Sequence, residues 1–267
     1  MTGGPDADLE LRRDPETIRA YLPRLAFFFE HWHRVSIEGL DRVPEGAALL
    51  VGNHNGGAMS PDMFALMVGW WRHHGVDTRA YGLMHDLPFR IPWAGDLMAR
   101  FGAVRASPAN AIELLRRGAR VLVYPGGDFD AYRPWSRRGE IVFGPRTGFV
   151  RVALRTGAPV VPVVSSGAHE GFRVLTDGRA IVERLGLKRR ARLEVFPVAL
   201  CLPWGVTFGP AVYLPLPVDI RIRVLPAIRW PELSAEAADD EAVVWRCREQ
   251  VREIMQASLD EMERDRR

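Results

Sequence analysis

Short β-branched apolar runs alternate along the chain with segments in which apolar residues recur at helical spacing. The apolar runs have the length and composition of buried strands, and they cover residues 47–51, 121–124, 160–164 and 220–225. Between them, helices are predicted at 62–71, 108–117 and 147–156, with Ser107 as the N-cap of the second and Gly157 ending the third. Strands that alternate with helices predict an α/β fold, a sheet with helices on its faces.

Longer amphipathic helices are predicted near both ends of the chain. In residues 15–33 the apolar side chains at helical spacing are Ile18, Tyr21, Leu22, Leu25, Phe28, Phe29 and Trp32. This helix either lies on a membrane surface, with Arg19, Arg24 and Arg34 near anionic headgroups, or packs on the protein's own core. The sequence leaves both interpretations open. A long C-terminal helix is predicted from Ser234 onward, docked on the body of the protein.

The longest run without a charged residue is 195–218. Its prolines, among them Pro203 and Pro215, would break a helix repeatedly in lipid, so we expect a hydrophobic loop and strand instead of a membrane span. The aromatic residues Trp204, Phe208 and Tyr213 in this run either contact lipid, line an acyl tunnel or are buried in the fold.

The amino-acid composition is typical of a globular protein in a reducing compartment. With 47% hydrophobic and 26% charged residues in 267, the chain is expected to form a single globular domain over 15–267, preceded by a flexible N-terminus at 1–14. The net charge of +3 suits anionic partners such as phosphates, coenzyme A or lipid headgroups. The two cysteines, Cys201 and Cys247, do not have metal-ligand spacing, and the first fifteen residues lack a secretory signal pattern. We therefore expect a reducing, cytoplasmic setting and no bound metal or cofactor.

Candidate chemistry lies in the turn after the first apolar run. There, Asn53, His54, Asn55, Gly56 and Gly57 follow the strand, and Asp62 opens the next helix. Ligands of α/β proteins usually sit at such turns. A neutral histidine can take a proton from a hydroxyl, and a carboxylate can orient the ring and stabilise the imidazolium.

The same residues have a simpler interpretation. In it, His54 is only hydrogen-bonded within the turn, while Asp62 caps the helix. His169-Glu170, which follows two serines, lacks the Gly-x-Ser-x-Gly pattern of a hydrolase, so it is not assigned to catalysis.

Four motifs in order resemble those of the lysophospholipid/glycerolipid acyltransferase superfamily. The Asn53-His54 pair followed by Asp62 resembles the first, and residues 101–105, ending in Arg105, resemble the second. Residues 121–127, which end in Pro125-Gly126-Gly127, resemble the third, and the proline-bearing residues 158–163 resemble the fourth. Together the resemblance covers about 36–167, with weaker similarity through Pro226.

The resemblance implies a fold, a reaction and its partners. The implied fold is a mixed, largely parallel sheet flanked by helices, and the implied donor is acyl-CoA or acyl carrier protein as co-substrate. His54 and Asp62 would be the catalytic pair that transfers a fatty acyl group to the hydroxyl of a lipid acceptor. Backbone N–H groups near Gly56 and Gly127 would stabilise the oxyanion. The expected location is the inner face of the membrane, with peripheral attachment.

The chain departs from the family pattern in two places. Seven residues separate His54 from Asp62 instead of the usual four, so the turn must bulge, which Gly56 and Gly57 permit. The third motif lacks the Glu, Thr and Arg of enzymes that act on lysophosphatidic acid. Its Pro-Gly-Gly form is closer to branches acting on neutral lipids or other lipid alcohols, with Asp130 as the expected acidic counterpart.

A basic cluster follows the third motif. Arg133, Arg137 and Arg138, with Trp135 between them, would bind the phosphates of coenzyme A or of a lipid headgroup, or else form a solvated loop. Aromatic and basic residues are also interleaved in single-strand nucleic-acid binders, but one short cluster does not support that partner. The expected substrate-binding residues are Asn53, Asn55, Gly56, Gly57, Arg105, Gly126, Gly127, Asp130 and Arg133. The sequence gives no oligomeric state. The alternative from another class is a catalytically altered, membrane-surface lipid-binding or scaffolding protein.

Overall fold

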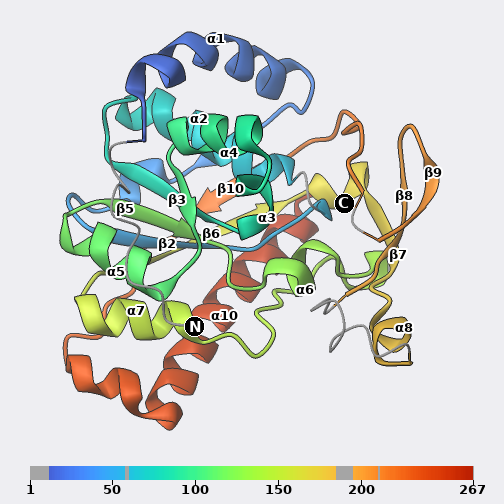
Figure 1. Ribbon diagram of the computed structural model, residues 1–267. Helices are drawn as coiled ribbons and strands as arrows, with labels where there is room; N and C mark the ends of the chain where they lie inside the picture. The colour runs from blue at the N-terminus through green and yellow to red at the C-terminus, as the bar shows by residue number, and fades with distance from the viewer. Residues whose placement is uncertain (1–11, 58–59, 185–194, 210, 267) are drawn as a thin grey trace.

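The computed structural model describes residues 12–57, 60–184, 195–209 and 211–266 (Figure 1). Its main sheet has seven strands in the order β1-β10-β6-β2-β5-β3-β4. Strands β6, β2, β5, β3 and β4 run parallel to one another, whereas β10 is antiparallel to β6 and parallel to β1. The strands are β1 (Ser36–Glu38), β2 (Ala48–Gly52), β3 (Ala80–Met84), β4 (Ala103–Arg105), β5 (Arg120–Val123), β6 (Val160–Ser166) and β10 (Arg221–Val224). The sheet is thus the mixed, largely parallel one that was predicted.

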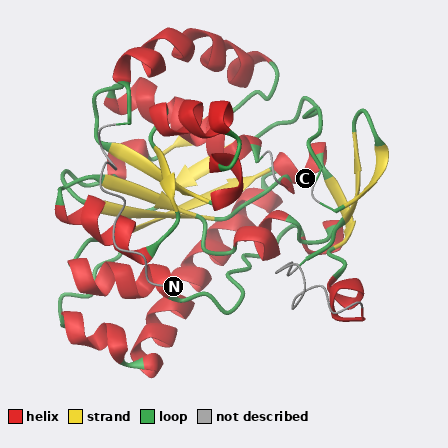
Figure 2. Ribbon diagram, viewed as in Figure 1, coloured by secondary structure: helices red, strands yellow, loops and turns green. Residues whose placement is uncertain are grey.

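Helices cover both faces of this sheet (Figure 2). Their bounds are α1 (Pro15–His31), α2 (Pro61–His74), α3 (Asp86–Phe89), α4 (Pro92–Arg100), α5 (Pro108–Arg116), α6 (Gly127–Ala131), α7 (Gly148–Thr156), α8 (Arg179–Arg184) and α10 (Glu241–Arg264). Helices α1, α2 and α4 lie on one face, and α5, α7 and α10 lie on the other (Figure 1).

The central strand β2 explains why the core has two halves. All five of its residues are buried, and alternate side chains of a strand point to opposite faces. Leu49 and Val51 therefore pack with the cluster beneath α5, α7 and α10, while Ala48 and Leu50 pack with the cluster beneath α1 and α2. The turn that follows β2 is consequently held by two hydrophobic cores.

A second, three-stranded sheet stands to one side of the main sheet (Figure 2). It is antiparallel in the order β7-β8-β9, with β7 at Arg173–Thr176, β8 at Val198–Cys201 and β9 at Gly205–Phe208. The sequence predicted a hydrophobic loop and strand within 195–218, and this segment contains β8 and β9. The antiparallel pairing with β7 was not predicted.

The helix ends follow local capping. The side chain of Ser107 accepts the amide of Asn110 at 3.1 Å, which confirms its predicted role as N-cap of α5. The C-terminal helix does not begin near Ser234 as predicted. Asp240 caps it by accepting the amides of Ala242 and Val243, so the α-helix begins at Glu241, after a 3₁₀ turn at Ala235–Asp239.

Helix α1 partly fits each of its two interpretations. Ile18 and Phe29 are buried against the core, whereas Phe27, Phe28 and Trp32 are exposed. No helix in the described part of the chain combines the length and apolar character needed to cross a bilayer. Most of the expected flexible N-terminus, residues 1–11, lies outside the described residues.

Candidate active site

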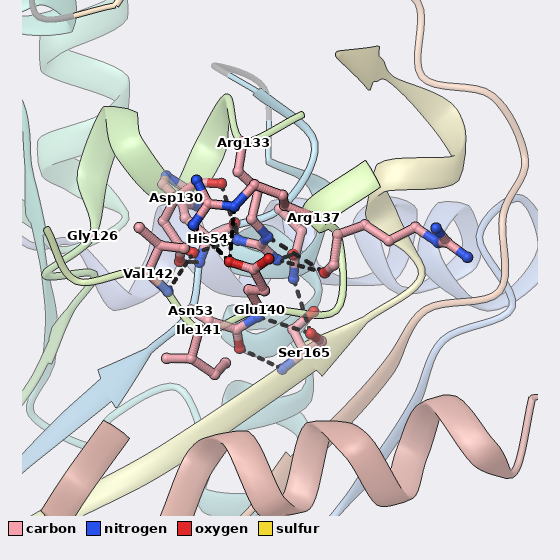
Figure 3. Close-up of polar contacts among 12 residues, drawn as sticks. Asn53, His54, Gly126, Asp130, Arg133, Arg137, Glu140, Ile141, Val142 and Ser165 are labelled. Atoms are coloured by element: carbon pink, nitrogen blue, oxygen red, sulfur yellow. Dashed lines mark hydrogen bonds and ion pairs between the residues drawn. The ribbon is translucent and has the colours of Figure 1, made fainter. Parts of the chain in front are cut away.

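The predicted site residues meet where β2 ends. The turn at 52–57 lies between the carboxyl end of β6 and the segment that follows β5, and it leads into α2 (Figure 3). β2 is the neighbour of both β5 and β6, so their carboxyl ends bring Ser165 and the α6 region to this turn. Gly52 makes the approach of Tyr124 possible, because a Cβ there would lie 2.5 Å from the Tyr124 ring.

Asn53 extends the ladder between β2 and β6 beyond the last paired strand residues. Its side-chain Nδ2 donates to the carbonyl of Ser165 at 2.9 Å, and its Oδ1 accepts the amide of Ser165 at 2.8 Å. The side chain is fully buried. Asn53 thus fixes the turn to β6 instead of presenting its amide to a ligand.

Asn55, Asp130 and Arg133 form a buried polar network around the backbone of His54 (Figure 3). Asp130 accepts the His54 amide through Oδ2 and the Arg133 guanidinium through Oδ1. Arg133 donates to the carbonyl of His54 at 3.1 Å and also to Oδ1 of Asn55. The network therefore holds both the backbone N–H and the backbone C=O of His54.

Arg133 and Asp130, which were predicted to bind substrate, are both buried and engaged with each other. The Arg133 side chain is 1% exposed and donates only to acceptors of this chain, including the carbonyl of Arg138 at 3.1 Å. Burial raises the pKa of Asp130 to about 6, and the charge of Arg133 opposes this shift. A guanidinium enclosed in this way has no face for a phosphate, so both residues position the turn.

His54 is partly exposed, and its imidazole stacks on Tyr124 with ring centroids 4.6 Å apart. Its Nε2 lies 3.4 Å from Oγ of Ser60, and that hydroxyl donates to the carbonyl of Gly57 at 2.7 Å. Nδ1 has no hydrogen-bond partner among the described residues. Burial, and secondarily the charge of Arg133, lowers the pKa of His54 to about 4. The ring is consequently neutral at pH 7 and has a free nitrogen.

Asp62 is buried in the first turn of α2. Its Oδ2 accepts Nδ2 of Asn55 at 3.2 Å, and its Oδ1 accepts the amide of Met63 at 2.8 Å. Burial raises the pKa of Asp62 to about 7, against the effect of these two donors. At neutral pH the group therefore stands near the midpoint of its titration.

The predicted His54–Asp62 hydrogen bond is not formed between these described side chains. Asp62 instead accepts from Asn55, and Asn55 is linked through Arg133 to the backbone carbonyl of His54. The longer spacing is accommodated as expected by positive φ angles of +84° at Gly56 and +68° at Gly57. Two residues of that spacing, 58 and 59, lie outside the described part. The catalytic pairing stays a prediction.

Close packing against backbone requires glycine at position 126, and a positive φ of +47° favours it at position 127. A Cβ at Gly126 would lie 2.2 Å from the carbonyl oxygen of Val142, and one at Gly127 would lie 2.1 Å from Nη1 of Arg146. The amide of Gly127 donates to the carbonyl of Tyr124 at 3.1 Å. This N–H is thus engaged within the chain, which argues against its predicted use as an oxyanion donor.

Arg105 is the one predicted site residue that lies apart from this cluster. It ends β4 at the far edge of the sheet, and β5 and β3 separate that strand from β2. Its guanidinium pairs with Asp86 at 3.4 Å and lies over the ring of Phe89. It is exposed and accessible to a ligand that extends from His54 across the sheet ends.

Three further residues lie near this turn that the sequence did not assign to the site. Tyr213 donates its hydroxyl to the carbonyl of Gly56, and Phe172 contacts Gly57. His169 is buried, and burial with the nearby charges of Arg133 and His54 holds its pKa well below the usual range. None of the three is close in sequence to His54, so only the fold reveals them.

A family model described as Acyltransferase matches residues 34–166, the stretch that runs from β1 through β6 and contains the turn at 52–57. An uncharacterized protein of Mycobacterium tuberculosis is 32% identical over 261 residues, which cover 97% of this chain and 70% of that protein. These matches show that the chain belongs to the Acyltransferase family.

Two further proteins resemble this chain, one in sequence over about half of its length and one in fold. A mouse protein named DGAT1/2-independent enzyme synthesizing storage lipids is 31% identical over 144 residues, 54% of this chain and 42% of the mouse protein. The crystal structure of PlsC, the 1-acyl-sn-glycerophosphate acyltransferase of Thermotoga maritima, has a TM-score of 0.54 at 19% identity. It covers 94% of this chain and 83% of that one, so it shares the fold.

Proposed function

We propose that this acyltransferase moves a fatty acyl group from a thioester, acyl-CoA or acyl carrier protein, to the hydroxyl of a lipid acceptor. The observation that carries the proposal is the state of His54, a neutral and partly exposed residue at the end of a central strand, whose buried Nδ1 has no hydrogen-bond partner among the described residues and whose Nε2 has only a 3.4 Å contact with Oγ of Ser60. A neutral ring can accept the proton of an acceptor hydroxyl.

The proposed reaction is direct transfer. His54 takes the hydroxyl proton as the oxygen attacks the thioester carbonyl, the C–S bond then breaks, and the proton passes to the departing thiolate. Asp62 is the carboxylate available to stabilise the imidazolium, since the two residues share contacts through Asn55 and Arg133. This role requires that the ring and the carboxylate approach each other during catalysis.

The acceptor is proposed to be a neutral lipid alcohol or acylglycerol, with lysophospholipids as the other member of the class. Three observations favour a neutral acceptor over a phosphate-bearing one. The third motif has Pro-Gly-Gly where enzymes acting on lysophosphatidic acid have a Glu-bearing motif, and the mouse relative is named for making storage lipids. The buried state of Arg133 also removes one cation from those available to an acceptor phosphate. A lipid acceptor in turn favours peripheral attachment to the inner face of the membrane.

The test is transfer by purified protein from labelled acyl-CoA to a panel of lipid alcohols, with His54→Ala as the main variant. Loss of a general base lowers such rates by roughly 10² to 10⁴-fold. His73→Ala is the matched control, because His73 is exposed at the far end of α2. Circular dichroism verifies that both variants are folded. Transfer by His54→Ala at the wild-type rate would refute the assignment.

A second candidate function follows from the missing His54–Asp62 hydrogen bond. A protein that kept the fold and lost the reaction would bind lipid without acylating it. The same assay separates the two, because a binding protein retains the lipids of the panel and yields no acylated product with either donor. Detection of product with the wild-type protein excludes this alternative.

A further inference from the structure

The outer face of the second sheet is apolar and exposed. Cross-strand neighbours in an antiparallel sheet point to the same face. Leu200 pairs with Val206, and Val198 pairs with Phe208, so these side chains form one surface. Leu200, Val206 and Phe208 are 41%, 51% and 69% exposed, whereas Ala199 and Cys201 on the opposite face are buried. Leu175 of β7 is also exposed, as are Leu202 and Trp204 between β8 and β9.

Two arginines border this face on the side of the active site. Arg173 of β7 pairs with Leu200, so it belongs to the outer face. Its guanidinium carbon lies 4.9 Å from the ring centroid of Trp135, and that of Arg138 lies 4.5 Å from the same ring. Neither arginine has an ion pair with a carboxylate in residues 12–57, 60–184, 195–209 and 211–266. The pair thus offers guanidinium donors next to an uncharged surface.

The face is also joined to the turn that carries His54. The carbonyl of Arg138 accepts from Arg133, which in turn donates to the carbonyl of His54. On its inner side the second sheet packs with Phe172 and Tyr213, the residues that contact Gly57 and Gly56. The second sheet therefore connects its outer face to the turn of the proposed site, although His54 itself lies away from that face.

We infer that the outer face of β7–β9 docks on the surface of an anionic phospholipid bilayer, with Arg173 and Arg138 binding lipid phosphates at its border. The apolar part of this face, with an exposed tryptophan, suits the interfacial region of a leaflet, and the guanidinium groups at its border suit the phosphates beside it. This inference rests on the proposed lipid substrate.

Charge favours a bilayer over a second copy of the chain. In a twofold dimer the same patch meets itself, and the described residues of the patch include no carboxylate that could pair with Arg173 or Arg138 of the other copy. A leaflet that contains anionic lipid supplies the opposite charge. The same surface therefore matches the bilayer both in its apolar centre and in its charged border.

The experiment measures cosedimentation of the full chain with vesicles of phosphatidylcholine alone or with phosphatidylglycerol added, without substrate. Phe208→Asp is expected to lower the partition coefficient on the mixed vesicles by about tenfold or more, the loss expected for a large apolar side chain. Arg173→Gln is expected to lower it about fivefold on mixed vesicles and to leave binding to pure phosphatidylcholine unchanged. Ile254→Asp, at an exposed aliphatic residue of α10, is the matched control and should bind as the wild type does.

Three outcomes would overturn the inference. The first is binding by Phe208→Asp equal to the wild type. The second is loss of binding in Phe27→Asp on α1 while Phe208→Asp binds normally, which would make α1 the docking element. The third is a dimer in sedimentation equilibrium that Phe208→Asp dissociates with vesicle binding intact. If Phe208→Asp melts at a lower temperature than the wild type, Phe208→Ser gives the same apolar loss without a charge.

His54→Ala keeps this inference separate from the proposed reaction. It should bind vesicles as the wild type does, because His54 lies away from the outer face. Vesicle binding by a protein that transfers no acyl group would remove the proposed function and leave the docking face standing. If the wild-type protein transfers acyl groups but Phe208→Asp and Arg173→Gln bind vesicles normally, the docking face is removed and the proposed function stands.

Discussion

At the scale of single residues, burial drives the two ionisable groups at the site toward their neutral forms. The pKa of His54 falls to about 4 and that of Asp62 rises to about 7. A neutral imidazole is the form that accepts a proton, whereas a neutral carboxyl group cannot stabilise an imidazolium. Near pH 7 His54 is therefore in the neutral form that the proposed general base requires. The protonation of Asp62, in contrast, depends on small changes of pH or of solvation.

The raised pKa of Asp62 predicts a pH-dependent stability. The unfolded chain ionises this group near its ordinary value of 3.8, and the folded protein does so only near 7. Wild-type stability relative to Asp62→Asn should thus fall as pH rises from about 4 to 7, by roughly 1 kcal/mol per pH unit, and then level off. Urea unfolding at a series of pH values measures this difference.

A difference in unfolding free energy that does not depend on pH is also expected between the wild type and Asp62→Asn. Asp62→Asn leaves one acceptor oxygen in place of two, so either Nδ2 of Asn55 or the amide of Met63 loses its acceptor. A lost buried hydrogen bond costs about 1–3 kcal/mol. This offset does not change with pH, so only the slope reports the titration. Parallel stability curves for the two proteins between pH 4 and 7 would show that the pKa of Asp62 is not raised.

At the scale of elements, the turn between β5 and α6 depends on Gly126. A Cβ there would lie 2.2 Å from the carbonyl oxygen of Val142 and 2.3 Å from Cβ of Asp130, and both are held in place. Gly126→Ala should therefore displace Asp130 from the His54 amide. We expect a loss of roughly 1–3 kcal/mol in unfolding free energy together with lower transfer activity.

Gly148 provides the control for this prediction. It lies in the first turn of α7, and a Cβ added there would meet no atom within 4 Å outside its own stretch of helix. Gly148→Ala should therefore leave activity close to wild type and leave stability unchanged or slightly improved. Urea unfolding of the two variants side by side isolates the steric cause. Equal stability of Gly126→Ala and the wild type would contradict the close packing of the third motif.

Three of the predicted strands lie in the middle of the main sheet, with a hydrophobic core on each side. β2, β5 and β6 are continuous apolar runs, and the turn after β2 was located from the residues that follow it. β3 was not predicted, because Gly82 interrupts it and it is only partly buried. The role of Arg133 was also missed, since a sequence shows a basic cluster but does not show which arginine the fold encloses.

At the scale of the whole molecule, the two sheets meet at the proposed site. Gly56 and Tyr213 are 157 residues apart, and no local pattern connects them. Their hydrogen bond joins the turn after β2 to the segment that follows β9, and Phe172 packs on both Gly57 and the Tyr213 ring. The position of His54 therefore depends on the second sheet as well as on the main one.

This dependence predicts the behaviour of Tyr213→Phe. The ring keeps its packing on Phe172, but the carbonyl of Gly56 loses a buried donor, which costs about 1–3 kcal/mol. Because the turn loosens while the chemistry of His54 is unchanged, we expect kcat to fall several-fold with a smaller change in KM. Tyr21→Phe, at an exposed tyrosine of α1, is the control that should leave both constants unchanged. A wild-type kcat in Tyr213→Phe, with the expected loss of stability, would mean that the second sheet supports the fold of the turn without setting the position of the catalytic ring.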